Sequence, residues 1–198
     1  MASSASSTLA WATLDTPVGP LSAGCTPAGL SQVRFGPPPR PASSPAAPPR
    51  AAGVQETPDR LDTARDLSRA VVTRLGEYFA GSRRSFDVPV DWTALSGLRR
   101  QVLQVLFDTV GYGQTVSYGA LADRAGLTGH DTALPARAVG QIMGSNPIPL
   151  VVPCHRVVAS DGLGGYSGGT GPEVKRWLLT FEGALPPTLD WEPARLNA

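Results

Sequence analysis

Cysteine and histidine are scarce in this sequence. Its 198 residues include two cysteines, Cys25 and Cys154, and two histidines. A disulfide-rich secreted domain of this length would normally carry several cysteine pairs. We therefore expect both thiols to be reduced and the protein to be cytoplasmic.

Long hydrophobic runs and a targeting segment are also missing. No stretch of the sequence approaches the roughly 20 apolar residues that a membrane span requires. Residues 1–8 are small and polar, without the basic and apolar regions of a secretory signal. We therefore expect no membrane partner.

An excess of charge of one sign is absent as well. The net charge is +1, and residues 93–198 carry eight basic and eight acidic side chains. Composition alone thus provides no indication of nucleic-acid binding. Any affinity for DNA must come from a few well-placed arginines and from complementary shape.

The first 91 residues begin with strand patterns. Residues 9–35 alternate loosely between apolar and polar side chains, which predicts two or three short strands. Residues 36–58 hold eight prolines, which predicts a surface loop or linker. Residues 84–90 alternate like one more strand. We predict an N-terminal α/β domain over residues 1–91.

A helix is predicted between these strand patterns. Apolar side chains recur at spacings of three and four from Leu61 to Tyr78. Asp59 is a plausible N-cap, and Gly81 ends the pattern. The apolar face of this helix is expected to pack on the first sheet.

The pattern becomes mainly helical in residues 92–185, which we predict to form a second domain followed by a tail over residues 186–198. A helix is expected over residues 93–109. Ser117 then caps a short helix, and Pro135 suits the first turn of another helix that reaches Met143. These two short helices resemble a helix-turn-helix.

The second of these short helices has few large side chains. Ala136, Ala138 and Gly140 leave a bare surface around the long side chain of Arg137. A bare helix can approach a nucleic-acid backbone closely, but small residues also allow close packing against another helix. Both interpretations stay open at this level.

The stretch from Asn146 to Val157 is the most informative part of the sequence. Prolines 147, 149 and 153 frame an apolar segment that we expect to be a buried strand, with Cys154 and His155 at its end. An imidazole or a water chain near a thiol increases its thiolate fraction. The alternative is a buried small side chain beside a structural histidine. Because neighbours in an extended segment point to opposite faces, His155 needs a turn or a bridging water to act on Cys154.

Residues 162–169 include five glycines together with Tyr166 and Ser167. Such a loop can pass its backbone close to a planar ligand at little steric cost. A flexible surface loop is the competing interpretation. A final amphipathic helix is expected from Val174 to Phe181, with Glu182 at its end.

Several motifs of the second half resemble those of the O6-alkylguanine-DNA alkyltransferases, also called methylated-DNA–protein-cysteine methyltransferases. The motifs occur in the order that the family has, and they lie at residues 116–118, 137–140, 146–147, 153–157, 166–169, 177–179 and 182–183. Residues 16–21 and 77–81 are similar more loosely. The resemblance implies a ribonuclease H-like N-terminal α/β domain before a helix-turn-helix-containing C-terminal domain. Some relatives bind a structural zinc, but no matching ligand set is found here, so we predict no metal.

The resemblance also implies a role for each site residue. Cys154 would accept the alkyl group, activated through His155 and a water, with Glu182 orienting the histidine. Asn146 would tie the Cys154 segment to the helix-turn-helix, and Tyr118 would hydrogen-bond the base near N3. Backbone groups near Cys154, Val157, Tyr166 and Ser167 would bind the extruded base.

The partner implied by the resemblance is double-stranded DNA that contains O6-alkylguanine. The helix-turn-helix would enter the minor groove through Ala136, Arg137, Gly140 and Gln141, with Arg137 filling the gap left by the rotated nucleotide. We expect a monomer without a cofactor that reacts once. Activity on O4-alkylthymine is left open.

Three rival functions are considered. A non-enzymatic relative that flags alkylated DNA would lack the acceptor cysteine, whereas Cys154 is present. A cysteine hydrolase needs turnover and an oxyanion hole, for which we find no separate motif. A transcription factor needs more long polar side chains to hydrogen-bond the base edges than Arg137 and Gln141 provide. The damage-flagging protein is the principal alternative.

Overall fold

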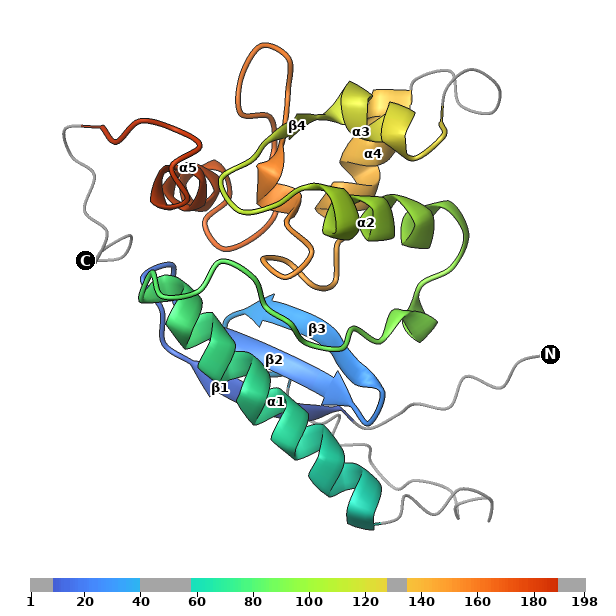
Figure 1. The fold of residues 1–198 in the computed structure, drawn as a ribbon, viewed down its shortest axis with the longest axis vertical. Helices are drawn as coiled ribbons and strands as arrows, with labels where there is room; N and C mark the ends of the chain where they lie inside the picture. Colours follow the sequence, from blue (N-terminus) through green and yellow to red (C-terminus); the bar gives the residue numbers. More distant parts are fainter. Residues whose placement is uncertain (1–8, 40–57, 128–134, 189–198) are drawn as a thin grey trace.

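The computed structural model describes residues 9–39, 58–127 and 135–188, and its ribbon is shown in Figure 1. Within these ranges the fold is mixed α/β, as the sequence predicts. Most of the proline-rich stretch and most of the predicted tail lie outside the described residues. No helix in the described ranges is long and apolar enough to cross a membrane.

A three-stranded antiparallel sheet opens the fold. It consists of β1 (Ala10–Leu14), β2 (Leu21–Thr26) and β3 (Gly29–Phe35), in the order β1-β2-β3. Every residue of the central strand β2 is buried, which explains why its sequence alternates only loosely. The predicted short strands are confirmed.

The long helix α1 (Pro58–Phe79) packs across this sheet and contacts all three strands. Its buried side chains Ala64, Val71, Leu75 and Tyr78 follow the predicted helical spacing. The helix begins at Pro58, so Asp59 lies inside it rather than at the N-cap. Gly81 follows its end with φ of 74°, a conformation that suits glycine.

The predicted strand over residues 84–90 is wrong. Only Val90 forms an isolated parallel bridge, with Leu30 of β3. Asp87 has φ of 44°, which breaks the extended backbone, and Pro89 has no amide hydrogen to donate. Alternation of side chains alone was therefore misleading here.

The second half contains short helices around a small parallel pair of strands. Its elements in order are η1 (Trp92–Ala94), α2 (Gly97–Thr109), β4 (Val116–Ser117), α3 (Tyr118–Arg124), α4 (Pro135–Gly144), η2 (Cys154–Arg156), β5 (Val157–Val158) and α5 (Pro172–Phe181). The helix predicted from residue 93 begins later, after the separate turn η1. Ser117 caps α3 as predicted, since its hydroxyl accepts a hydrogen bond from the amide of Ala120.

The apolar segment before Cys154 is buried but is not the predicted strand. Leu150 has φ of 72°, and the Val152 amide donates to the carbonyl oxygen of Ile148 over 2.8 Å, which closes a turn. The prolines of this segment lack the amide hydrogens that a strand ladder needs. The segment is therefore a compact buried turn that leads directly into η2.

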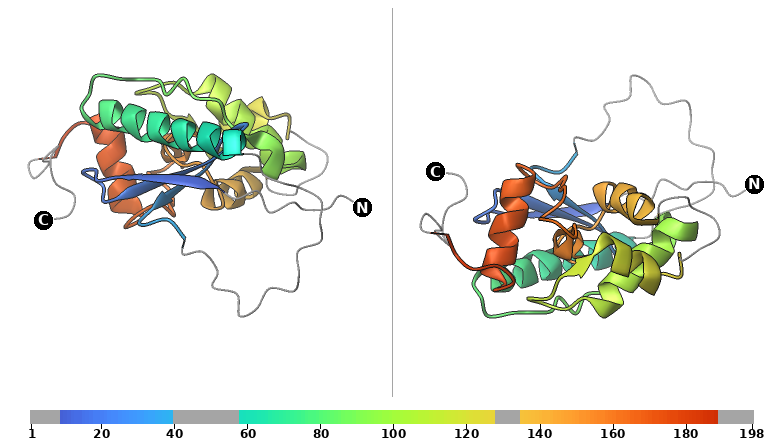
Figure 2. Two further views of the ribbon diagram at one scale, coloured as in Figure 1. Left: turned by 90° about the horizontal axis from the view of Figure 1, so that it is seen from below. Right: turned by 90° about the horizontal axis from the view of Figure 1, so that it is seen from above.

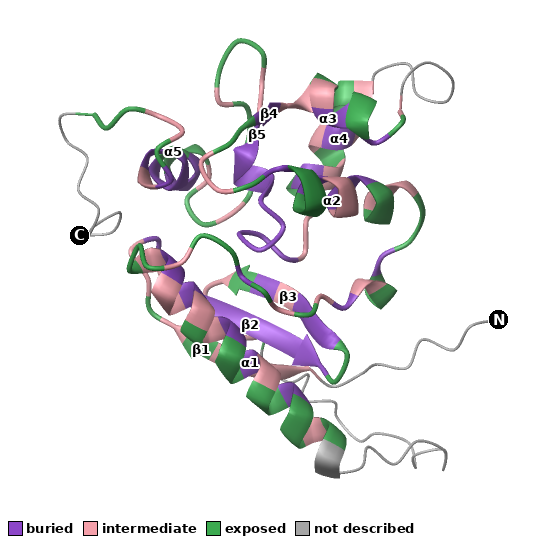
Figure 3. Ribbon diagram, in the orientation of Figure 1, coloured by how far each residue is buried: buried purple, intermediate pink, exposed green. Residues whose placement is uncertain are grey.

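The C-terminal helix α5 lies beside the C-terminal end of α1 in Figures 1 and 2. Aromatic side chains fill this junction, with Phe79 of α1 in contact with Trp177 and Phe181 of α5. Figure 3 shows that burial is concentrated along β2, one face of α1 and the turns around η2. The helices α1 and α5 therefore share one packed region, and α5 also contacts η2, which carries Cys154.

Candidate active site

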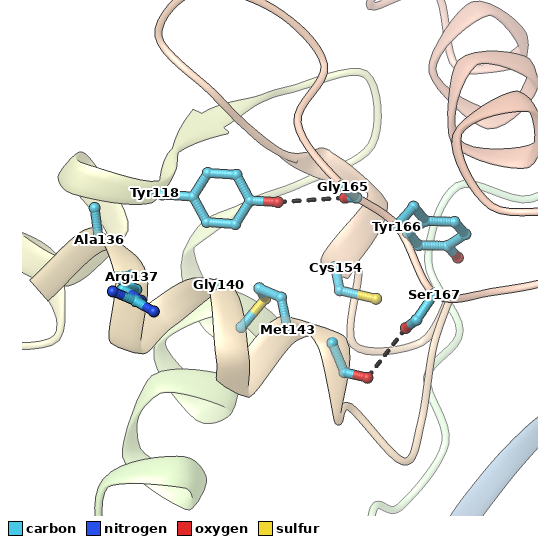
Figure 4. A pocket seen from close by; sticks show the side chains of 10 residues that line it. Tyr118, Ala136, Arg137, Gly140, Met143, Cys154, Gly165, Tyr166 and Ser167 are labelled. Carbon is cyan, nitrogen blue, oxygen red and sulfur yellow. Dashed lines mark hydrogen bonds between the residues drawn. The ribbon is translucent and has the colours of Figure 1, made fainter.

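A cavity of about 610 Å³ opens beside Cys154, as Figure 4 shows. Its size falls in the range of small-molecule sites in proteins. The lining residues are Tyr118, Ala136, Arg137, Gly140, Met143, Gly144, Cys154, Gly165, Tyr166 and Ser167. The structure thus brings three separate motifs of the sequence to one cavity: α3, α4 and the glycine-containing loop.

The thiol of Cys154 lies in a short 3-10 helix, η2, at the cavity. Its residue is 5% exposed. Burial raises the pKa of this thiol, although the nearby Asn146 amide and the Lys175 charge act in the opposite direction. The resting cysteine is therefore a protonated thiol, and a base must take its proton before the sulfur can attack.

Asn146 holds the segment that carries Cys154. Its side-chain amide donates to the carbonyl oxygen of Val152 over 2.8 Å, and its side-chain oxygen accepts from the amide of Ile148 at 3.0 Å. Both partners belong to the buried turn. Because Asn146 directly follows α4, the bonds connect that helix to the turn before Cys154.

His155 is fully buried and is paired with Glu182. Its Nε2 lies 3.1 Å from Oε1 of Glu182. Because an ionised carboxylate only accepts hydrogen bonds, His155 donates from Nε2, and this assignment leaves Nδ1 with a free lone pair. Nδ1 is buried and has no hydrogen-bond partner among the described protein groups. Burial lowers the pKa of His155 against the opposing effect of Glu182, so the ring is a neutral base.

Glu182 is the centre of a buried hydrogen-bond network. Arg156 donates to both carboxylate oxygens, from Nε at 2.8 Å and from a terminal nitrogen at 2.9 Å. The Tyr78 hydroxyl donates at 2.8 Å, and the Gly113 amide donates at 3.2 Å. Burial alone would raise the pKa of Glu182, but the bonds from His155 and Arg156 outweigh it and hold the pKa well below its usual range.

Lys175 is buried behind the cavity. Its ammonium group donates to the carbonyl oxygens of Val157 at 2.7 Å and Gly165 at 3.1 Å, and it lies 5.7 Å from the centroid of the Tyr118 ring. Burial lowers the pKa of Lys175 to about 8, with the Cys154 thiol opposing this effect. The Tyr118 hydroxyl donates to the same Gly165 carbonyl at 3.3 Å.

The glycine-containing loop packs closely against the rest of the protein. The Ser167 hydroxyl donates to the carbonyl oxygen of Gly144 at 3.1 Å, and Tyr166 meets Phe35 of β3 edge to face. A side chain added at Gly168 would lie 2.6 Å from the Phe35 ring. These contacts favour the binding-loop interpretation over a flexible surface loop.

Two of the small residues predicted to leave a bare surface on α4, Ala136 and Gly140, line the cavity, whereas Ala138 does not. Ala136 is exposed and lines the cavity together with Gly140, where a methyl group would find ordinary contact with Tyr118 at 3.9 Å. Arg137 is exposed at the cavity, and Gln141 is exposed outside its lining. Helix packing therefore does not require a small side chain at position 140, which favours the close-approach interpretation of this surface.

One predicted base-binding residue lies outside the cavity. Val157 does not line the cavity, and its carbonyl oxygen already has Lys175 as a partner. The second histidine of the sequence, His130, lies outside the described residues. Among the residues that the structure describes, no three His, Cys, Asp or Glu side chains gather as metal ligands.

Comparison with known proteins identifies the family. A family model described as the DNA-binding domain of 6-O-methylguanine DNA methyltransferase matches residues 97–184. The methylated-DNA–protein-cysteine methyltransferase of Rattus norvegicus is 38% identical over 182 residues, which cover 86% of this chain and 80% of the relative. The chain belongs to the methylated-DNA–protein-cysteine methyltransferase family.

One further relative and one solved structure are also similar to this methyltransferase-family protein. A Thermus thermophilus protein named as a DNA base-flipping protein is 39% identical over 174 residues, which cover 87% of this chain and 99% of the relative. The crystal structure of Mycobacterium tuberculosis OGT in complex with DNA matches with a TM-score of 0.63 and 33% identity, covering 88% of this chain and 93% of that chain. That structure is named as a complex with DNA, and the name of the Thermus thermophilus protein refers to base flipping.

Sequence reasoning missed three members of this methyltransferase-family site. Tyr78 was assigned to an apolar helix face, and Arg156 and Lys175 received no role. Lys175 lies among the apolar residues of α5 in the sequence, and this position could have indicated a role. A buried ammonium group needs hydrogen-bond partners. The partners themselves are distant in sequence.

Proposed function

We propose that this protein repairs DNA by irreversible transfer of the alkyl group from O6 of guanine to Cys154. One observation carries the proposal. The buried thiol of Cys154 lines a cavity, and the next residue is the neutral His155, whose Nε2 is hydrogen-bonded to the ionised carboxylate of Glu182. Family membership is consistent with this chemistry. Each molecule reacts once, because a thioether is stable.

The reaction is a single displacement. A water passes the Cys154 proton to Nδ1 of His155, and Glu182 stabilises the imidazolium that forms. The thiolate sulfur attacks the alkyl carbon, so that an S–C bond forms while the C–O6 bond breaks. The electron pair of that bond goes to the guanine, which takes up one proton, equivalent to the one that Cys154 released, and stays in the DNA as the ordinary base. No cofactor is needed for this step.

Stabilising the departing guanine is the main electrostatic task. We assign this role to Tyr118, which lines the cavity: when the base binds, its hydroxyl exchanges the Gly165 carbonyl for N3 of the base. The backbone around Tyr166 and Ser167 binds O6, and carbonyl groups near Cys154 accept from the exocyclic amine, whereas Val157 lies outside the cavity lining. The position of Lys175 beside Tyr118 and Gly165 supports a positive potential at this end of the cavity.

Double-stranded DNA is the partner in this proposal. We propose that α3 and α4 act as a helix-turn-helix that enters the minor groove, with Ala136 and Gly140 allowing close approach. Arg137 fills the space that the extruded nucleotide leaves, and Gln141 contacts the DNA beside it. The exposed position of Arg137 at the mouth of the cavity supports this assignment.

We further propose a monomer whose chain divides at residues 91 and 92. The ribonuclease H-like part, residues 1–91, supports the site, and residues 92–185 bind DNA and carry Cys154. The packing of α1 on the first sheet supports this division. The monomeric state is tested by the elution volume of the purified protein in size-exclusion chromatography, with and without DNA.

The activity is tested by mixing the protein with a duplex that carries one O6-methylguanine and measuring the intact protein mass. We expect a stoichiometric gain of one methyl group, mapped by peptide sequencing to Cys154. Cys154→Ala is the control and gains nothing. Tight binding of the duplex without any gain in mass would replace this proposal with the damage-flagging function.

A further inference from the structure

Tyr78 joins the N-terminal part of the chain to the active-site network. Its hydroxyl oxygen lies 2.8 Å from Oε1 of Glu182, although the two residues are separated by 104 positions in sequence. Tyr78 belongs to the last turn of α1, and its side chain is 1% exposed. No part of Tyr78 lines the cavity.

The ring of Tyr78 is packed for reasons that do not involve its hydroxyl. Four aromatic rings surround it at centroid distances between 5.0 and 6.0 Å: Phe79, Phe86, Tyr112 and Phe181. A phenylalanine would fill the same place. A buried hydroxyl without a partner is costly, so the oxygen is tolerated because Glu182 accepts its hydrogen bond.

The donors to Glu182 come from different elements. Oε1 accepts from Tyr78 at 2.8 Å, from Arg156 at 2.9 Å and from His155 at 3.1 Å. His155 and Arg156 both belong to η2 and therefore move together. Among the described residues, Tyr78 is the one donor to Oε1 that lies outside η2. It therefore ties this oxygen to α1, independently of the helix η2 that carries Cys154.

We propose that Tyr78 is a positioning residue for alkyl transfer: its hydroxyl holds the Glu182 carboxylate in the orientation that keeps the proton of His155 on Nε2 and the lone pair on Nδ1. This inference rests on the proposed function. It assigns a role in the chemistry to the N-terminal part of the chain, because Tyr78 of α1 bonds to Glu182 although it does not line the cavity.

The first test is the single-turnover rate of methyl transfer from an O6-methylguanine duplex. In Tyr78→Phe we expect the first-order rate constant to fall about 10-fold, because one hydrogen bond to a charged group is lost. The affinity for the duplex and the fraction of molecules that finally become methylated should stay the same. A rate constant equal to that of the wild type would overturn the inference.

Tyr112→Phe is the matched control. Its hydroxyl belongs to the same aromatic cluster but donates to the backbone carbonyl of Phe181 at 3.3 Å. Its rate constant should stay within about two-fold of the wild type. If Tyr78→Phe lowers the methylated fraction through poor folding, the rate constant of the remaining active molecules still decides the question. An equal fall in both variants would assign the effect to the cluster and reject the inference.

A double-mutant cycle tests whether Tyr78 acts through Glu182. In the Glu182→Gln background, Tyr78→Phe should change the rate constant by less than about two-fold, because the group that Tyr78 positions is already altered. A full additional 10-fold loss, expected if the hydroxyl acts independently, would contradict the proposal.

A readout without alkyl transfer separates this inference from the proposed function. The chain has two histidines, so long-range ¹H–¹⁵N NMR spectra contain two imidazole patterns, and His130→Gln assigns them. The wild type should show His155 as the Nε2-protonated tautomer, and Tyr78→Phe should show a mixture of tautomers. An unchanged pattern would reject the inference. A wild type that transfers no methyl group would reject the proposed function alone.

Discussion

Asn146 donates a hydrogen bond of 2.8 Å from its side-chain amide to the carbonyl oxygen of Val152, six residues along the chain. The bond closes the turn in which Leu150 adopts φ of 72°. Bulky residues rarely adopt this conformation unless surrounding contacts hold it. The position of Cys154, two residues after Val152, therefore depends on a side chain that lies outside the cavity.

Asn146→Ala should destabilise the protein and slow alkyl transfer. The substitution leaves the carbonyl of Val152 and the amide of Ile148 without their side-chain partner, at a cost of about 1–3 kcal/mol in the free energy of unfolding. Urea unfolding measures this change. Ser145→Ala, at an exposed neighbouring residue, should cost less than about 0.5 kcal/mol. Equal stability of the two variants would show that the Asn146 bonds contribute nothing.

Glu182→Gln should cost more stability than a surface substitution of the same type. Removing the carboxylate charge leaves the buried guanidinium of Arg156 without its ion-pair partner, and breaking such pairs typically costs about 3–5 kcal/mol. Glu77→Gln is the control, because its pair with Arg83 is partly exposed and screened by solvent, so its loss should cost much less. Thermal and urea unfolding of both variants provide the comparison, and similar losses would contradict this account of Glu182.

Arg137→Ala should impair extrusion of the base without affecting the fold. The exposed side chain contributes less than about 0.5 kcal/mol to folding. Unstacking a nucleotide costs a few kcal/mol, so losing the residue that fills the gap should weaken binding to damaged DNA about 10-fold. Fluorescence of 2-aminopurine at the target position reports extrusion. Arg69→Ala, an exposed arginine on α1, should leave the signal unchanged, and a normal signal in Arg137→Ala would exclude the assigned role.

Cys25 should make the protein less stable at alkaline pH. Burial raises the pKa of Cys25 to about 12, so the folded state keeps the proton that the unfolded chain releases near pH 9. The folded state then binds more protons than the unfolded state, and stability falls as pH rises. The stability advantage of the wild type over Cys25→Ala should be constant below pH 8 and shrink above pH 9, by up to about 1.4 kcal/mol per pH unit. The measurement is urea unfolding of the wild type, Cys25→Ala and Cys25→Val over this pH range. If the stability of the wild type and of either variant changed in parallel with pH, the prediction would be contradicted.

Helices were predicted well where apolar residues recur over several turns, as in α1 and α5. The two strand predictions that failed, residues 84–90 and the segment before Cys154, concern short stretches that contain prolines. Their backbone is decided by local breaks such as the positive φ of Asp87 and Leu150 and by contacts with distant residues. Periodicity over so few residues does not distinguish a strand from a buried turn.

The sequence alone determined that a thiol and an imidazole are adjacent behind a proline, and that a bare helix carries Arg137. It also determined the family resemblance. Only the tertiary structure decided that Cys154 and His155 lie in a 3-10 turn, that Nδ1 of His155 is left with a free lone pair, and that Tyr78 reaches Glu182. The physical reason is that hydrogen bonds between distant residues depend on how helices pack, and neither spacing nor composition specifies that packing.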